Sequence, residues 1–233
     1  TVYTAVYNVT DAGVDVNAVT VGVSGAKDVA GNAQQSYTAA TEFEIDTLNP
    51  TATISLSDSA LQIGDTATVT ITFSEAVSGF SLDDLSSPNG VLSNWSGEKV
   101  NGDGTVSYTA TFTPNSIVEA ATNVVSLATS YTDVAGNTGT VAESANYAID
   151  TKAPTVTDVT ASDSLITDAD TGAAKLSVAV TFSEAMDTTA TPSLTLSPAV
   201  DSSVTFATGS WNAGGTVYTA VYNVTDAGVD VNA

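Results

Sequence analysis

The 233-residue sequence contains no cysteine, no histidine and no arginine, and only four lysines. Without cysteine the chain can form neither a disulfide framework nor a thiolate metal site. Four cations are too few for a nucleic-acid surface, because neutralising phosphates requires clusters of Lys and Arg. No apolar run approaches the roughly 18–20 residues that a membrane-spanning helix needs. We therefore expect no nucleic-acid partner and no membrane span in this segment.

The side chains that commonly carry catalysis are also scarce. The sequence has no G-x-S-x-G nucleophile motif and no phosphate-binding loop. Only a pair of carboxylates could perform acid–base chemistry, as in glycosidases. The acidic residues fall in predicted loops rather than in an apolar cleft that would raise the pKa of one of them. The sequence therefore predicts a protein that is not an enzyme.

Negative charge is what the sequence has in excess. Asp and Glu total 26, which gives a formal net charge of −22. Mutual repulsion of these carboxylates opposes compaction, although 42% hydrophobic residues are enough to build real cores. The acidity is explained either by solubility alone or by divalent cations that bind shared carboxylates and neutralise them. Both interpretations stay open at this point.

Strict alternation of apolar and polar residues runs through the chain. TATVTITF at 66–73 places Ala, Val, Ile and Phe on one face and four Thr on the other. KLSVAVTF at 175–182, VSYTATFT at 106–113 and VYTAVYNV at 217–224 follow the same pattern. A period of two indicates half-buried strands, and no segment shows a sustained helical period. About seven such strands per ~100 residues predict an all-β fold of tandem immunoglobulin-like β-sandwich domains.

Internal repeats set the domain boundaries. TVYTAVYNVTDAGVDVNA opens the chain at 1–18 and closes it at 216–233 without a difference. A weaker repeat relates FEIDTLNPTAT at 43–53 to YAIDTKAPTVT at 147–157, and DVAGN occurs at 28–32 and 133–137. These repeats predict a complete repeat of type A over residues 49–152. Residues 1–48 are then the C-terminal part (strands E–G) of a type B repeat, and residues 153–233 are the N-terminal part (strands A–E) of the next one.

The chain is therefore expected to be a window on a longer A-B-A-B array, with neighbouring repeats as its partners. Both tryptophans, Trp95 and Trp211, are expected to pack in or against a core. The strands of the complete type A repeat are expected at Ala52–Leu56, Thr66–Phe73, Phe80–Leu85, Val91–Trp95, Val106–Thr113, Asn123–Ser130 and Thr140–Ile149.

The motifs FSEA, DVAGN and IDTxxP, in this order and spacing, resemble the bacterial Ig-like repeats of giant cell-surface and biofilm-associated adhesins of the RTX type. The stretch from GDTATVTITFSEAVSGFSLDDL to YTDVAGN resembles one common repeat type over nearly the whole of residues 49–152. The resemblance implies tandem modules, often stiffened by calcium, that hold a ligand-binding tip away from the cell. It also implies an extracellular location, at the bacterial surface or in a biofilm matrix.

The predicted topology brings sequence-distant carboxylates to one pole of each sandwich. FSEA follows strand B, DVAGN lies between strands F and G, and the Asp of IDT precedes strand A, so the three groups should meet at the inter-domain junction. Calcium takes about six to eight oxygen ligands, which such a cluster provides. Alternatively, DVAGN is only a turn. The predicted Ca²⁺ ligands are Asp46, Glu75, Asp133 and Asn137 at the first junction, and Asp150 and Glu184 at the next, completed by equivalents of Asp28 and Asn32.

A second set of acidic residues is expected at the opposite pole of the type B repeat. DADTG at 168–172 lies in the predicted A–B loop and DAGVDVN at 226–232 in the E–F loop. D-x-D-x-G is similar to the opening of a calcium-binding loop but lacks the distal glutamate of an EF-hand. The candidate ligands are Asp168, Asp170, Asp226 and Asp230, with Asp11 and Asp15 as the N-terminal copy.

The sequence thus predicts an extracellular extender, or stalk, of a large repetitive adhesin or matrix filament that supports cell adhesion and biofilm formation. Calcium at the junctions would stiffen it, and lateral self-association of chains into filaments is left open. The alternative is a calcium-dependent module that binds a carbohydrate, ice or another repetitive surface through its Thr-rich faces.

Overall fold

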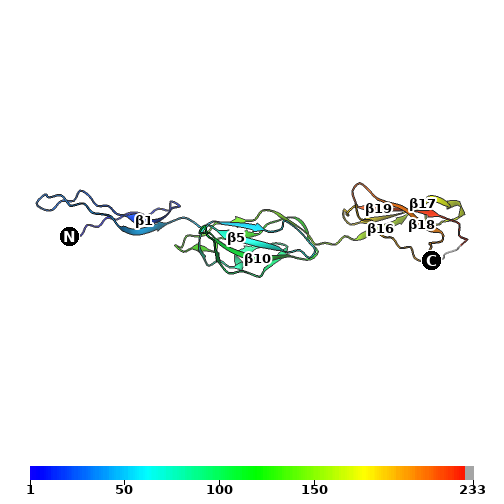
Figure 1. Cartoon of the computed structure of the whole chain (residues 1–233), viewed down its shortest axis with the longest axis horizontal. Helices are drawn as coiled ribbons and strands as arrows, with labels where there is room; N and C mark the ends of the chain where they lie inside the picture. Colours follow the sequence, from blue (N-terminus) through cyan, green and yellow to red (C-terminus); the bar gives the residue numbers. More distant parts are fainter. Residues whose placement is uncertain (229–233) are drawn as a thin grey trace. The chain divides into compact units, whose positions relative to one another are not determined.

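A computed structural model describes residues 1–228 of the chain (Figure 1). It divides the chain into two compact units, Thr1–Lys152 and a second that begins at Ala153. Strands make up nearly all the regular structure of the described residues, and the helices there are two short 3-10 turns, η1 (Leu82–Asp84) and η2 (Asp168–Asp170). Neither of these described helices has the length or the apolar character to pass through a bilayer.

Residues 49–152 form a two-layered domain, and its first layer is an antiparallel sheet. Along β5 and β10 every second side chain is buried, as the alternation in the sequence predicts. The central pair is in register over seven residues, with Ile71 opposite Tyr108. The strand order is β3 (Ala52–Leu56), β5 (Ala67–Phe73), β10 (Val106–Pro114) and β8 (Gly90–Ser93), with β9 (Lys99–Val100) also paired to β10.

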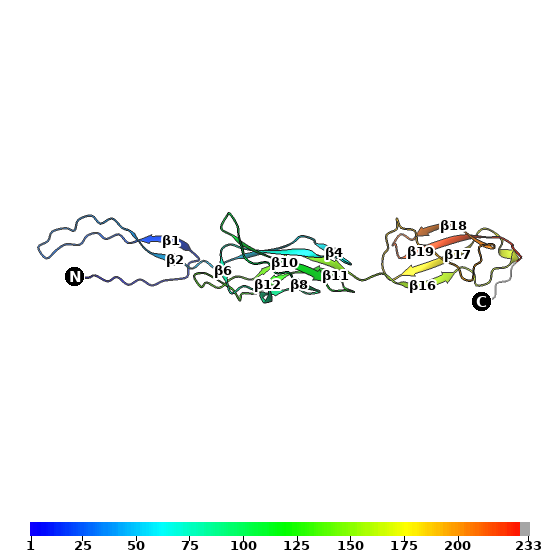
Figure 2. The ribbon, with the colours of Figure 1, turned by 60° about the horizontal axis from the view of Figure 1, so that its bottom comes forward.

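The second layer of this domain is built from shorter strands, which Figure 2 shows beside β10. Register shifts and turns interrupt them, as between Ala120 and Asn123. One sheet has the order β11 (Glu119–Asn123), β15 (Tyr147–Asp150) and β4 (Ala60–Gln62), in which β4 runs parallel to β15. In the other pairings, β12 (Ser126–Leu127) lies between β14 (Ala142–Glu143) and β7 (Leu85–Ser86), and β13 (Thr132–Asp133) pairs with β6 (Val77–Ser78).

A single hydrophobic core lies between the two layers. Phe73 and Phe112 of the first layer and Tyr147 of the second are all 1% exposed or less. Each such side chain stabilises the fold by roughly 1.5–3 kcal/mol relative to an exposed one. The predicted all-β sandwich is therefore confirmed. Trp95 packs against this core, stacked on Tyr108 with ring centroids 5.3 Å apart.

Three strands of the sandwich were predicted wrongly as continuous. The strand predicted at Asn123–Ser130 is reduced to the end of β11 and the two residues of β12, and the one predicted at Thr140–Ile149 is divided into β14 and β15. Phe80–Leu85 does not form a continuous strand, because η1 occupies Leu82–Asp84 and only β6 and β7 flank it. The backbone N–H of Ser81 donates to the Asp84 carboxylate at 2.7 Å, and the N–H of Asp84 returns a bond to the Ser81 carbonyl at 3.2 Å. This reciprocal capping favours a helical turn over an extended chain.

Residues 1–48 contain one hairpin, formed by β1 (Asp15–Thr20) and β2 (Thr41–Asp46), with Asp15 opposite Asp46. The strand expected over residues 2–9 is absent, and Val2 and Tyr3 are about nine-tenths exposed. The same residues occur again as β19 in the second unit, where strands on both sides supply hydrogen bonds. An isolated strand has no such partners, which explains the difference.

The second unit has one four-stranded sheet with the order β16 (Val156–Ala161), β17 (Gly172–Phe182), β19 (Val217–Val224) and β18 (Val204–Trp211). This connectivity matches that of the first layer of residues 49–152, β3-β5-β10-β8. Tyr218, Ala220 and Tyr222 of β19 are the centre of its core. Trp211 packs against this core, and its indole N–H donates to the Ala190 carbonyl at 2.8 Å.

Candidate metal centre

Three carboxylates from distant parts of the first unit meet at one end of the sandwich. Asp46 ends β2, Glu75 follows β5 after one residue, and Asp133 ends β13. One carboxylate oxygen from each lies within 4.8 Å of the others. Among residues 1–228 this is the one group of three or more such side chains that could hold a metal ion. The convergence expected from FSEA, DVAGN and IDT is therefore present in the structure.

The DVAGN segment positions Asp133 by means of a tight turn. The Asp133 carboxylate accepts hydrogen bonds from the backbone N–H groups of Gly136 and Asn137, at 2.7 and 2.8 Å. Gly136 has a φ of +101°, a conformation that a residue with a Cβ rarely adopts. DVAGN thus forms a turn, and the same turn places a buried carboxylate, 2% exposed, beside Asp46 and Glu75.

Asn137 joins two members of this group. Its side-chain amide donates to Asp133 Oδ2 at 2.8 Å and to Asp46 Oδ1 at 3.2 Å. It also lies 3.3 Å from the Asp46 backbone carbonyl, which accepts from it. Asn137 was predicted as an oxygen ligand; in the structure it presents N–H groups to the carboxylates and so holds them together rather than adding an oxygen.

The pKa values of Glu75, which is half-buried, and Asp133, which is buried, shift in opposite directions. Burial raises the pKa of the Glu75 carboxyl above its ordinary value, and the charges of Asp133, Asp46 and Asp15 raise it further. Burial would also raise the pKa of Asp133, but hydrogen bonds from the Asn137 side chain and from the backbone N–H groups of Asn137 and Gly136 outweigh it and lower that pKa. A nearby cation would favour the charged form of Glu75, which its burial and the neighbouring carboxylates disfavour.

Asp15 is a fourth acidic residue close to the Asp46–Glu75–Asp133 group. It lies opposite Asp46 in the β1–β2 hairpin, and its charge acts on Glu75. The sequence placed Asp15 with Asp11 in a separate set, because a loop position gives no strand register. Within residues 1–228 the one ion pair joins Lys152 to Glu119, so no lysine ammonium pairs with these four carboxylates. Oxygen-only donors with an uncompensated charge suit Ca²⁺ better than a softer metal.

Asp28 and Asn32 form the same turn in residues 1–48 as Asp133 and Asn137 do in the sandwich. The Asn32 side chain donates to Asp28 Oδ2 at 2.7 Å and its backbone N–H to Oδ1 at 2.8 Å. The Asn32 hydrogen bond lowers the pKa of Asp28. Both residues are exposed, and no third carboxylate joins them among the described residues.

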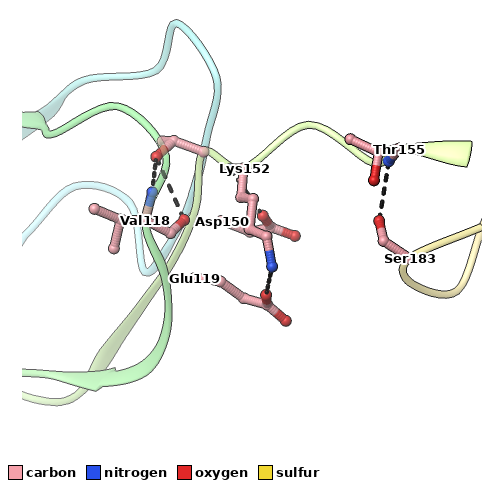
Figure 3. A network of polar contacts seen from close by, with 7 residues as sticks. Val118, Glu119, Asp150, Lys152, Thr155 and Ser183 are labelled. Atoms are coloured by element: carbon pink, nitrogen blue, oxygen red, sulfur yellow. Dashed lines mark hydrogen bonds and ion pairs between the residues drawn. The ribbon is translucent and has the colours of Figure 1, made fainter. Parts of the chain in front are cut away.

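The residues predicted for the second junction, Asp150 and Glu184, lie in different units. Asp150 ends β15 in the first unit, where its carboxylate accepts from the backbone N–H of Lys152 at 3.3 Å. Lys152 forms an ion pair with Glu119 across 3.1 Å, as Figure 3 shows. Glu184 lies in the second unit, two residues after β17, and its Oε1 is a buried atom without a hydrogen-bond partner in the described residues. The Lys152–Glu119 pair was not foreseen.

Asp168 and Asp226, from the second predicted set, line one cavity of the second unit. Asp170 instead caps η2, where it accepts from the backbone N–H and the hydroxyl of Thr167, both at 2.8 Å. Asp226 and Asp11 each accept from the N–H two residues on, as expected for identical sequences. Asp230 lies outside the described residues.

Most of the sandwich is similar to a known protein family. Residues 46–149 match the model of a family described as the bacterial Ig-like domain. This segment is similar to bacterial Ig-like domains. The bacterial Ig-like part of the predicted resemblance is thereby confirmed for these residues, which are less than half of the chain, and the giant RTX-type adhesin stays a prediction. The match begins at the linker aspartate Asp46, so the matched segment includes all three members of the carboxylate group.

Among solved structures, the chain is similar to FdeC, described as a broadly conserved Escherichia coli adhesin. The identity is 15%, the alignment covers 74% of this chain and 55% of that chain, and the TM-score is 0.30. The chain thus spans about half the length of that structure. A TM-score this low transfers neither a fold nor a function. No curated protein matches the sequence.

Proposed function

We propose that this chain is part of an extracellular, non-enzymatic stalk of a large repetitive bacterial adhesin or matrix filament of the RTX type, stiffened by calcium. The observation that supports it is the Asp46–Glu75–Asp133 group, which joins the end of β2 to two loops of the following sandwich. A cation bound there would tie the linker to the domain. Support of cell adhesion and biofilm formation is the role that such a stiffened extender would serve.

The domain organisation that goes with this proposal is a tandem array. Residues 49–152 are the complete repeat, and residues 1–48 and 153–233 are parts of a second repeat type whose copies alternate with it. The likeness in connectivity between β16-β17-β19-β18 and β3-β5-β10-β8 supports this division. Neighbouring repeats of the same polypeptide are then the partners of each domain.

Calcium binding is tested by calorimetry on the full chain. A ligand that binds only the folded state stabilises it by about 2.7 kcal/mol at a hundredfold excess over Kd. We expect the melting temperature to rise in millimolar calcium and to fall in chelator. Titration with Ca²⁺ should give a weaker site in Asp46→Asn than in the unmodified chain, and Asp158→Asn, an exposed change on β16, is the control. A melting temperature that calcium leaves unchanged would refute the proposal.

A second candidate function rests on the outer face of the first sheet. Thr53, Thr72 and Ser107 lie side by side across β3, β5 and β10, and so do Ser55, Thr70 and Thr109. Such rows of hydroxyls could bind a repetitive surface, the alternative function considered for the sequence. Retention of the chain on ice or crystalline cellulose, abolished by Thr70→Lys but not by Thr157→Lys on β16, would favour this function over the stalk.

A further inference from the structure

The chain has two linkers, DTLNP at 46–50 and DTKAP at 150–154. The same two hydrogen bonds hold the start of each linker. After β2, the N–H of Thr47 donates to the Val14 carbonyl at 2.8 Å, and the N–H of Val14 donates to the Thr47 hydroxyl at 3.1 Å. After β15, Thr151 and Val118 repeat this exchange at 2.7 and 3.0 Å (Figure 3). The Asp-Thr pair therefore fixes each linker to the strand beside it in the same way.

The strand register extends this equivalence to the carboxylates. Asp15 lies opposite Asp46, and Glu119 lies opposite Asp150. Each linker thus leaves an antiparallel strand pair, β1–β2 or β11–β15, whose last residue pair carries two acidic residues. Like charges directly opposite one another destabilise such a pair, so both strand pairs favour a cation at this place.

The two linkers differ in the residue that follows Thr. In the second linker this residue is Lys152, whose ammonium contacts the Glu119 carboxylate at 3.1 Å. In the first linker it is Leu48, which is 45% exposed and has no charge. The chain itself thus supplies a cation at one strand pair and none at the equivalent place in the other.

We infer that Lys152 is a built-in counter-ion that holds the second linker without a bound divalent cation, whereas the first linker depends on one. The first half stands on the ion pair and the matched strand pairs alone. The second half rests on the calcium-binding role proposed above. In an alternating array, every second linker would then respond to calcium, and the stalk would have two kinds of joint.

The ion pair is exposed at both partners, so its effect is modest. Exposed pairs of this kind shift an equilibrium by a few-fold at most, and salt weakens them. A lysine introduced at position 48 would place one positive charge beside Asp15 and Asp46, and we expect it to weaken Ca²⁺ binding there by about tenfold or less.

Hydrogen exchange of the Thr47 and Thr151 amides in the full chain tests the inference, because each amide reports on one linker. On removal of calcium we expect faster exchange at Thr47 and unchanged exchange at Thr151. Leu48→Lys should make exchange at Thr47 insensitive to chelator. Lys152→Leu should speed exchange at Thr151 by about two- to fivefold, and Lys99→Leu, on β9, should have no effect.

The outcomes separate the inference from the proposed function. If titration shows calcium binding but chelator affects Thr47 and Thr151 equally, the inference is wrong and the stalk proposal stands. If no calcium binds, the proposed function fails together with the second half of the inference. The first half is then judged by Lys152→Leu alone, and unchanged exchange at Thr151 in that variant would overturn it.

Discussion

The side-chain amide of Asn137 donates a hydrogen bond to the carboxylate of Asp46, 91 residues earlier in the chain, across 3.2 Å. The same amide donates to Asp133 at 2.8 Å. This residue thus joins the end of the β1–β2 hairpin to the turn that follows β13 of the sandwich. Without any metal, it provides a direct polar link between residues 1–48 and residues 49–152.

Asn137→Ala removes these bonds and should lower the free energy of unfolding by about 1–3 kcal/mol, as for other hydrogen bonds to charged groups. Asn32→Ala, in the equivalent but exposed turn, is the matched control and should change unfolding little. The loss should shrink in acid. The pKa of Asp133 in the folded state is lower than its ordinary value of 3.8, so its hydrogen-bonded carboxylate stabilises the fold at pH values above 3.8. This contribution is lost as the pH falls through the folded-state pKa. Urea unfolding at pH 7 and pH 3 measures both effects, and an equal loss in the two variants would contradict this assignment.

The substitution Glu75→Gln should have opposite effects on the melting temperature in chelator and in calcium. In chelator, burial and three neighbouring carboxylates raise the pKa of Glu75, so its ionisation destabilises the folded state as the pH rises above its ordinary value of 4.5. Removing the charge should therefore raise the melting temperature at pH 7. In calcium, the same change removes a ligand and should lower it. Glu143→Gln, on exposed β14, is the charge-matched control, and scanning calorimetry in both buffers decides. A shift of the same sign in both would exclude Glu75 as a ligand.

Gly139 tests the packing of the second layer. A Cβ at this position would lie 2.2 Å from the Tyr131 ring, which is fully buried between the layers. Gly139→Ala should therefore cost about 1–3 kcal/mol of stability through overpacking. At Gly102 a Cβ would meet nothing within 4 Å, so Gly102→Ala is the control. Thermal unfolding of the two variants compares them, and equal melting temperatures would show that Tyr131 is not packed as described.

How far the sequence predicts this structure depends on whether a feature is set by local pattern or by partners in space. Strands β3 and β5 follow the predicted ranges within one residue, because alternation identifies a half-buried strand locally. The octapeptide at 217–224 is a strand while its copy at 2–9 is not. Hydrogen-bond partners decide that difference, and they are invisible in the eight residues themselves.

The candidate site shows the same division. Placing Asp46, Glu75 and Asp133 together needed only the order of strands in a sandwich, which the motifs supply. The position of Asp15 beside Asp46 depends on the register of a hairpin whose strands are separated by twenty residues of loop. The Lys152–Glu119 pair depends in the same way on the register between β11 and β15. Comparing the residues opposite each linker aspartate would have found both.

The final prediction concerns the freedom of the first linker. Its backbone is fixed on one side by the Thr47–Val14 bonds and on the other by the Thr140 N–H, which donates to the Pro50 carbonyl at 3.2 Å. Only Leu48 and Asn49 lie between these anchors, and Pro50 keeps Asn49 extended. A cation held jointly by Asp46, Glu75 and Asp133 would restrict the remaining freedom of Leu48 and Asn49.

Small-angle scattering should therefore give a larger maximum dimension in calcium than in chelator. Glu75→Gln should give the chelator value in both buffers, while Glu143→Gln should behave as the unmodified chain. Equal dimensions with and without calcium would remove the stiffening role, whatever the affinity of the site, because a stalk needs its linkers to stay extended under the conditions in which it works.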